Sequence, residues 1–537
     1  MPFLDARRIP DGATLETDVC IVGAGAAGCT LARELAGQDF KVFLIESGGI
    51  RYDGRIQALA KGELASDFGF PLDDTRVRGF GGTTAIWMGA CRPLDAYDFE
   101  PHDWVPYSGW PFGRSELDPY YARAQVVCQI GPPTYELQDW EEPDAQELPL
   151  DPQCIDTQLF QISPPTRFAR AYREAIFSAP NITTLLHANV LEIDTTDNTR
   201  VATSVRIATF NRTRFRVGAR LFVLAVGGVE APRLLLASNR RNPAGLGQEH
   251  DLVGRFFMDH PRLESAVLHL NDAPTRMRLY RVHASHRVAP PTAIEGFLSI
   301  ASEALARERM VRCAFQVPPH WRSYPEFHSN GVMALRQIAW AIRAGHVPYR
   351  WPHRVRTALA GARAVALTAL RRLGEGHMSR ADFVLTACGE QAPNPASRVV
   401  LAETRDYFGA PQPRLDWQLS EIDLRSIRRA NEILASAVKA AGIGCVTSLI
   451  DSNGKSRNLR GGFHHMGTTR MHRDPRQGVV DPDCRVHGMA NLFIAGSATF
   501  PTGGYANPTL TIVALALRLA DHIRDQLRNG PPPVNVC

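Results

Sequence analysis

The stretch at residues 18–49 constrains the fold most strongly, because it has the pattern of one complete strand–turn–helix–strand unit. An apolar run at 19–22 is typical of a buried parallel strand, and a helical pattern follows it after a glycine-rich turn. A second strand-like run ends at residue 45. Two parallel strands joined by a helix begin a doubly wound sheet, so the sequence predicts an α/β domain in this part of the chain.

Three glycines in this unit have the spacing of a dinucleotide-binding turn. Gly23, Gly25 and Gly28 form G-x-G-x-x-G, and Glu46 directly follows the second strand. In such turns the first glycine permits the tight bend, the second lets the backbone approach a pyrophosphate, and the third lets the helix pack on the strand. An acidic residue at the position of Glu46 meets a ribose hydroxyl. The unit therefore predicts a bound dinucleotide.

Length and composition indicate a soluble enzyme of more than one domain. A chain of 537 residues exceeds one ordinary hydrophobic core. The first residues lack the apolar core of a signal peptide, and no apolar run approaches about 20 residues, so we expect a cytoplasmic protein without a transmembrane segment. Ten cysteines occur without a C-x-x-C pair, which indicates reduced thiols and no metal site.

The formal charge of +5 is concentrated in one segment. Residues 336–374 hold eight arginines and no acidic residue, and the remaining chain is slightly acidic. No nucleic-acid-binding module is recognisable, so we expect no nucleic-acid partner. The spacing of apolar residues in this segment predicts a pair of amphipathic surface helices; a lid, an oligomer contact or a contact with an anionic membrane are the alternatives.

Strand-like and helical segments continue through the rest of the chain. Residues 189–195 and 201–209 alternate as strands do, and 220–238 repeat the order of apolar strand, Gly-Gly turn and helix. Between 258 and 446, short strand-like segments predict an antiparallel sheet, and a long helix is predicted over 419–441.

Several blocks together carry a resemblance to a known family. They are GAGAAG with Glu46, GGTTAIW at 81–87, LAVGGVEAPRLLLAS at 224–238, HHMGTTRM at 464–471 and NLFIAGSATFPTGGYANPTLT at 491–511. In this order they resemble the glucose-methanol-choline (GMC) family of FAD-dependent alcohol oxidoreductases over nearly the whole chain. Within that family the chain is most similar to the branch of pyranose 2-oxidase and bacterial sugar or glycoside oxidases and dehydrogenases.

The resemblance implies an α/β fold with two interleaved domains. One is a Rossmann-like FAD-binding domain of the GMC fold, and the other is an α+β substrate domain built on an antiparallel sheet. The FAD-binding domain is expected to comprise residues 1–92, 181–260 and 447–537. The substrate domain is expected to comprise 93–180 and 261–446, with the arginine-rich helical insertion at 336–374.

The resemblance also implies roles for individual residues. The family's catalytic pair falls on His464, six residues before Arg470, and on Asn507; His465 is the competing candidate. The expected FAD contacts follow the chain. The pyrophosphate would be held at Gly23, Gly25 and Gly28, the adenosine ribose by Glu46, and the adenine by the backbone of Val190. The flavin would lie along Gly81, Gly82, Thr83 and Thr84, and its isoalloxazine ring would lie near Gly496, Asn507, Pro508 and Thr509.

One residue departs from the pattern of pyranose 2-oxidase. There, the position that matches Ile86 is a histidine that bonds covalently to the flavin. Isoleucine cannot form that bond, so we expect non-covalent FAD.

The implied reaction is oxidation of an alcohol on a sugar, glycoside or sugar-containing natural product to a carbonyl, with hydride transfer to flavin N5. A neutral histidine suits the proton transfer, because its ordinary pKa of roughly 6.5 lies near working pH. The expected partners are the small-molecule substrate and an electron acceptor, O2 or a quinone; an oligomer is possible. The alternatives are a non-redox lyase of the hydroxynitrile-lyase kind, a flavin-binding module without catalysis, and a nicotinamide dehydrogenase.

Overall fold

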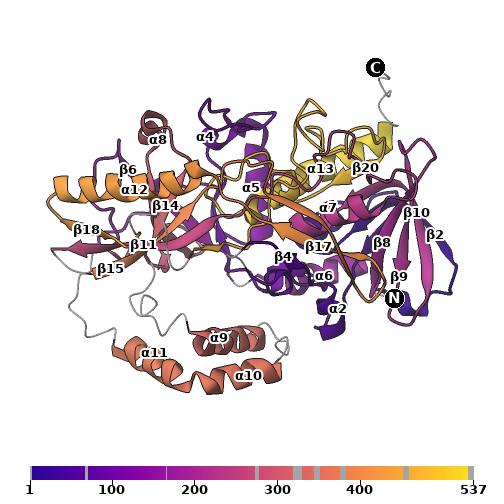
Figure 1. Ribbon diagram of the computed structural model, residues 1–537, viewed down its shortest axis with the longest axis horizontal. Helices are drawn as coiled ribbons and strands as arrows, with labels where there is room; N and C mark the ends of the chain where they lie inside the picture. Colours follow the sequence, from indigo (N-terminus) through magenta and orange to yellow (C-terminus); the bar gives the residue numbers. More distant parts are fainter. Residues whose placement is uncertain are drawn as a thin grey trace.

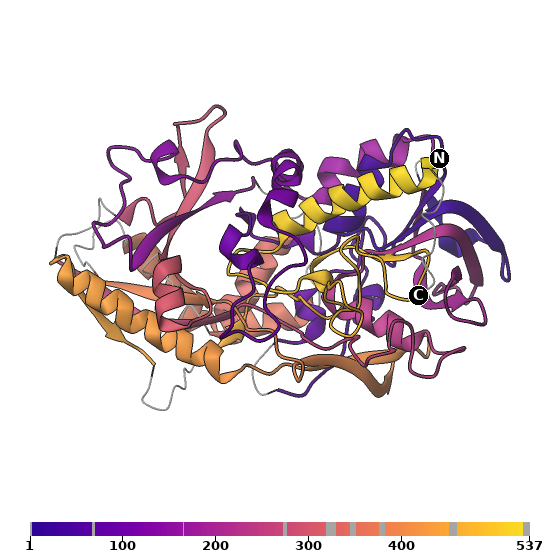
Figure 2. The ribbon, with the colours of Figure 1, turned by 90° about the horizontal axis from the view of Figure 1, so that it is seen from above.

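The computed structural model describes residues 3–66, 70–164, 166–271, 277–317, 329–343, 351–374, 382–450 and 459–529. Two large sheets lie side by side along the long axis of the molecule, one at each end of the view in Figure 1. Figure 2 shows the same arrangement from above, with α13 (Thr509–Asn529) running across the first sheet. No helix within these ranges is long and apolar enough to cross a membrane.

The first sheet has eight strands, and its central strands are parallel, as the glycine-rich unit predicted. Strand β10 pairs in parallel with β2 and β20 and antiparallel with β9, so the chain returns to this sheet as expected. The strands in spatial order are β1 (Leu4–Asp5), β7 (Ile182–Leu186), β3 (Val42–Ile45), β2 (Thr14–Val22), β10 (Arg214–Leu224), β9 (Ala202–Ala208) and β8 (Asn189–Thr195), with β20 (Leu492–Ile494) beside β10.

Helices cover the first sheet and complete its core. Helix α1 (Ala26–Glu34) packs against α6 (Phe168–Ser178) and α13, and α5 (Asp118–Cys128) packs on α13. Leu31 of α1 and Leu35, which directly follows α1, are both fully buried. Helix α7 (Gly227–Ala237) follows β10 and contacts β8.

The second sheet has nine strands and is antiparallel, as the short strand-like segments predicted. Helix α12 (Glu421–Ala440) packs on one face; its start is fixed by a capping box in which Ser420 and Asp423 exchange hydrogen bonds. The strands are β18 (Gly444–Ser448), β11 (Pro261–Leu270), β15 (Asp382–Gly389), β14 (Cys313–Gln316), β13 (Thr292–Ile300), β6 (Ile155–Ile162) and β5 (Ala90–Cys91), with β12 (His283–Ser285) beside β13 and β19 (Arg460–Gly461) beside β11.

Smaller elements connect the two sheets. A three-stranded sheet contains β16 (Arg398–Arg405), β17 (Pro411–Asp416) and β4 (Glu63–Leu64). The short helices are α2 (Gly54–Ala58), α3 (Leu72–Thr75), α4 (Ala96–Phe99) and α8 (Ser302–Glu308), and the segment Gly82–Ala85 forms one 3-10 turn, η2.

The arginine-rich segment differs from its prediction. It forms three helices rather than two: α9 (Asn330–Arg343), α10 (Trp351–Ala360) and α11 (Ala362–Gly374). Gly361 separates the last two, because glycine stabilises a helix poorly and lets the chain change direction. Figure 1 shows these helices set apart from the two sheets.

Candidate active site

The glycine-rich turn between β2 and α1 has no room for side chains at two of its three glycines. Gly23 has a φ of +99°, and a Cβ there would lie 2.6 Å from the carbonyl oxygen of Ala225. A Cβ on Gly28 would lie 1.8 Å from the carbonyl oxygen of Gly23. Only glycine permits helix α1 to pack so closely on strand β2. As a result, the N-terminus of α1 points at the space next to the glycine-rich turn.

The third glycine of the motif borders open space. A Cβ built on Gly25 would meet no atom within 4 Å. The same holds for Gly496, which is buried and has a φ of +127°. Gly25 is half-buried and Gly496 is buried, so both loops border open space that a ligand could occupy.

Glu46 lies beneath the turn and is nearly buried. Its carboxylate accepts hydrogen bonds from the backbone N–H groups of Ala24 (2.9 Å) and Gly48 (2.8 Å). Burial raises the pKa of Glu46, and the two N–H donors act in the opposite direction. Next to it, the Ser47 hydroxyl donates to the side-chain oxygen of Asn189 (2.7 Å), so Val190 is close to this end of β3.

The GGTT loop packs directly on the glycine-rich turn. The N–H of Gly81 donates to the carbonyl of Ala24 (2.8 Å), and a Cβ on Gly82 would lie 2.8 Å from the Cα of Gly25. The Thr84 hydroxyl donates to the Gly81 carbonyl (2.6 Å) and holds the loop's shape, whereas Thr83 is exposed. Segments about 55 residues apart in sequence thus line the same space.

His464 is paired with a second histidine. Its Nδ1 lies 2.8 Å from the Nδ1 of His260, which directly precedes β11, and the rings meet edge to face. Burial, His260 and Arg262 together hold the pKa of His464 well below its ordinary value. Burial and Arg262 lower the pKa of His260 to about 4. Both rings are therefore neutral at physiological pH, and one proton lies between the two Nδ1 atoms.

Asp259 fixes the loop that carries His464. Its buried carboxylate accepts hydrogen bonds from the backbone N–H groups of His260 (2.7 Å), Gly462 (2.9 Å), Phe463 (3.2 Å) and His464 (2.9 Å). Burial raises the pKa of Asp259 to about 6, against the opposing effect of these donors. One side chain thus joins the start of β11 to the histidine loop.

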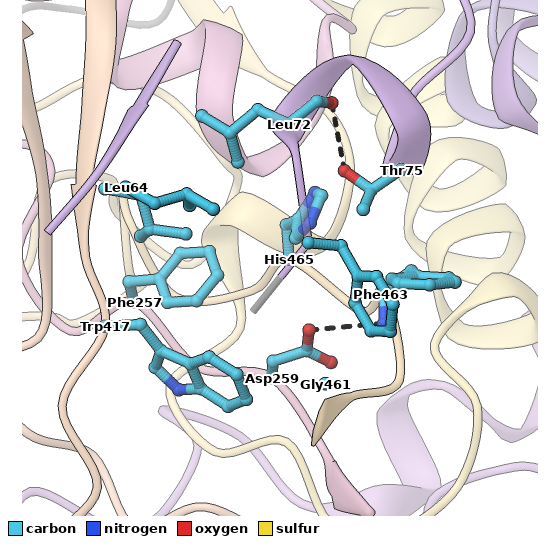
Figure 3. Close-up of a pocket in the computed structure, with 11 residues that line it drawn as sticks. Leu64, Leu72, Thr75, Phe257, Asp259, Trp417, Gly461, Phe463 and His465 are labelled. Carbon is cyan, nitrogen blue, oxygen red and sulfur yellow. Dashed lines mark hydrogen bonds between the residues drawn. The ribbon is translucent and has the colours of Figure 1, made fainter. Parts of the chain in front are cut away.

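His465 has different surroundings. Figure 3 shows it lining a pocket with Leu72, Phe257, Trp417 and Phe463. Its ring centroid lies 5.8 Å from that of Phe257. Burial, with a smaller effect from Arg76, lowers the pKa of His465 to about 3. Adjacent histidines therefore occupy separate environments, and only His464 is bonded to His260.

Asn507 lies in the loop that leads into α13, immediately before Pro508 and Thr509. Its amide nitrogen donates to the carbonyl of Ala90 (3.1 Å). Gly503, four residues earlier in this loop, lies beside His260, because a Cβ on Gly503 would lie 3.6 Å from the Nε2 of His260. The loop that carries Asn507 thus runs past the histidine that is bonded to His464.

Comparison with known proteins identifies this arrangement. Residues 393–516 match the C-terminal model described as GMC oxidoreductase, and residues 21–50 match an NAD(P)-binding Rossmann-like domain. The chain carries the C-terminal domain of a GMC oxidoreductase. It is 25% identical to the fructose dehydrogenase large subunit of Gluconobacter japonicus, over 96% of this chain and 99% of the relative. It is 26% identical to paromamine 6'-oxidase of Streptomyces fradiae, over 95% and 92%.

The fold of the chain is also that of a solved structure. The chain matches pyridoxine 4-oxidase from Mesorbium loti with a TM-score of 0.57 and 18% identity, over 94% of this chain and 99% of that one. At this identity the likeness shows the fold alone.

FAD is the cofactor of the GMC oxidoreductases, and the residues of this chain fit it. The N-terminus of α1 and the open side of Gly25 suit a pyrophosphate, since free backbone N–H groups and the helix dipole favour an anion there. The buried Gly496 faces space that a flat ring could occupy. Glu46 and the GGTT loop border the same region.

A chain of polar side chains crosses the second sheet next to the histidine pair. Arg262 donates to the side-chain oxygen of Gln316 (2.6 Å), and the Gln316 amide donates to Glu295 (2.9 Å). These residues come from β11, β14 and β13 and project from the face opposite the α12 core. Arg262 is close enough to lower the pKa of both His260 and His464. We call this row the polar wall.

Sequence reasoning missed Asp259, His260 and the polar wall. The run Met258–Pro261 stood out only as the point where the pattern changes, because nothing in a single sequence shows that His260 and His464, 204 residues apart, are in contact. An acidic residue and a histidine side by side before a strand were the available signal. The alternation along β11 then places Arg262 on the same side as His260.

Proposed function

We propose that the chain oxidises an alcohol on a sugar or glycoside to a carbonyl, with His464 as general base and Asn507 as the residue that orients the alcohol. When bound, FAD accepts the hydride from the carbinol carbon. The remaining requirement is to remove the hydroxyl proton. The observation that carries this proposal is the bond between His464 and His260, because it determines which ring nitrogen is free.

The bond to His260 would select the tautomer of His464. The buried Nε2 of His260 has no hydrogen-bond partner in the described residues, and we assign the proton of that ring to Nε2 because the backbone of Gly503 and Gly504 lies beside it. The Nδ1 of His260 is then an acceptor, so the Nδ1 of His464 must donate. That leaves the Nε2 of His464 with a lone pair. A neutral imidazole of this tautomer can accept the proton of an alcohol.

Asn507 can hold the alcohol oxygen without titrating. Its amide nitrogen carries two hydrogens, and one is used by the Ala90 carbonyl. The second is available for the substrate oxygen. Fixing that oxygen between Asn507 and His464 supplies the orientation that a hydride transfer requires.

The polar wall is the reason to propose a polyhydroxylated substrate. Arg262, Gln316 and Glu295 present donors and acceptors whose positions are fixed by hydrogen bonds to one another. Such a row can hydrogen-bond several hydroxyl groups of one substrate. A plain aliphatic alcohol would cover these polar groups without forming hydrogen bonds to them, which costs binding free energy. The substrates in the names of the two relatives, fructose and paromamine, are consistent with this preference.

The proposal is tested by turnover with a panel of free sugars, aryl glycosides, aminoglycosides and simple alcohols. Oxygen and a soluble quinone are supplied separately as electron acceptors, and the product is identified by mass spectrometry as the substrate less two hydrogens. We expect a polyhydroxylated substrate to react, His464→Gln to abolish turnover, and the adjacent His465→Gln to retain most of it. Equal loss in both variants, or a preference for simple alcohols, would contradict the proposal.

A further inference from the structure

The three arginine-rich helices expose large apolar side chains. Fifteen such side chains are exposed in the described residues, and five of them lie on α9, α10 and α11: Leu335, Ile342, Trp351, Leu359 and Leu370. Their exposed fractions run from 41% to 69%. A third of the exposed large apolar side chains thus falls on a small fraction of the chain, which marks these helices as an interaction surface.

Packing among the helices explains why these side chains are left outside. Gly331 and Gly361 approach so closely that a Cβ on either would lie 2.6 Å from the Cα of the other. Small or partly polar residues occupy the interior, with Val332, Ala334 and Thr368 buried. The helices are therefore held together by a narrow inner seam, and their larger apolar residues are not needed for it.

The same helices contain arginines and no acidic residue of their own. Residues 327–374 contain eight arginines and no Asp or Glu. Arg356 and Arg363 are exposed, whereas Arg354 is half-buried and forms an ion pair with Asp74 of α3 (3.3 Å). Arg354 thus ties the helices to the rest of the molecule, and the other two arginines remain at the surface.

We propose that α9, α10 and α11 dock this protein onto a negatively charged lipid bilayer. Exposed Leu, Ile and Trp side chains can enter the boundary between headgroups and acyl chains, while guanidinium groups bind the phosphates beside them. Docking would be peripheral, because no helix within the described ranges could span a bilayer. The bilayer would then contact both the arginines and the exposed apolar side chains of these helices.

Charge argues against two other occupants. A symmetric contact with a second copy would place this surface against itself and bring arginines against arginines. A nucleic acid would use the arginines but leave Leu359, Leu370 and Trp351 without an apolar partner. An anionic bilayer satisfies the arginines and the apolar side chains together.

The experiment is sedimentation of the full-length, FAD-loaded protein with lipid vesicles. One set is phosphatidylcholine alone, and the other contains about one-third phosphatidylglycerol, at about 0.05 M and 0.3 M salt, which differ strongly in screening. We expect binding to the anionic vesicles at low salt, several-fold weaker binding at high salt, and little binding to phosphatidylcholine. Failure to bind anionic vesicles at low salt would overturn the proposal.

Two double variants separate the contributions of charge and apolar contact. Arg356→Gln with Arg363→Gln, and Leu359→Gln with Leu370→Gln, should each weaken binding by roughly tenfold. Val126→Gln is the matched control, because Val126 is 67% exposed elsewhere on the chain. Unchanged binding in both double variants would overturn the proposal, as would a concentration-dependent dimer that these variants abolish. Unchanged flavin content and melting temperature show that the variants are folded.

Discussion

The hydrogen bond between the rings of His260 and His464 leads to a quantitative prediction of kcat/KM for two variants of His260. His260→Asn and His260→Leu both remove the ring and leave side chains of the same branched shape. Asparagine keeps a polar atom where the Nδ1 of His260 lies, 2.8 Å from the Nδ1 of His464, and leucine does not. The two variants therefore differ in one hydrogen bond to His464, with packing nearly matched.

The magnitude follows from the tautomer of His464. Without an acceptor, the buried N–H on Nδ1 is left unsatisfied at a cost of about 1–3 kcal/mol, so the proton moves to Nε2 and blocks the base. A bias of about 1.4 kcal/mol is a factor of ten in the fraction of competent enzyme. We expect kcat/KM of His260→Leu to lie about tenfold or more below that of His260→Asn.

The assay is steady-state turnover of the two variants with FAD content matched by absorbance. The loss should fall on kcat rather than KM, because the substrate contacts are unchanged and only the base is affected. Equal kcat/KM in the two variants would refute the tautomer argument. A difference confined to KM would also refute it, since it would assign His260 to substrate binding.

Three further predictions test other parts of the site. Burial, then His260 and Arg262, hold the pKa of His464 well below its ordinary value, so kcat/KM should decline only at a pH well below the ordinary pKa of a histidine. Arg262→Gln should move that decline to higher pH, and an unmoved profile would contradict the charge effect. Asp259→Asn loses the acceptor for the Phe463 N–H and should lower the free energy of unfolding by about 2 kcal/mol in urea titration; a wild-type midpoint would show that the loop does not depend on this carboxylate. Because Ile86 cannot bond to the flavin, acid precipitation should release all FAD into the supernatant, and flavin retained in the pellet would show a covalent link.

Local sequence patterns predicted much of the fold. The strand, glycine turn and helix at Gly23 form as expected, because their signals lie within a few residues of one another. The long helix at Glu421–Ala440 was equally predictable from Ser420 and the apolar spacing. Its neighbours on the antiparallel sheet were predicted as strands, but their order was not, since strand order depends on contacts far apart in sequence. The division of the chain into two interleaved domains stays a prediction.

Only those residues of the candidate site that lie within a continuous sequence motif could be predicted. Counting back from Arg470 selected His464 over His465, and that choice stays a prediction; the structure pairs His464 with His260. Nothing in the sequence placed Asp259 beneath the histidine loop or Gln316 between Arg262 and Glu295. These are contacts across strands and loops, which arise only when the second sheet forms. The third arginine-rich helix was missed because Gly361 gave a weaker break signal than a proline would.

Anaerobic rapid mixing of the FAD-loaded protein with its best substrate observes the chemical step alone and so measures whether His464 removes the hydroxyl proton. We expect loss of the visible flavin absorbance in the wild type, a rate lower by about 10²-fold or more in His464→Gln, and a near-normal rate in His465→Gln. Rapid loss of absorbance in His464→Gln would rule out His464 as the base, because the proton would then leave by another route.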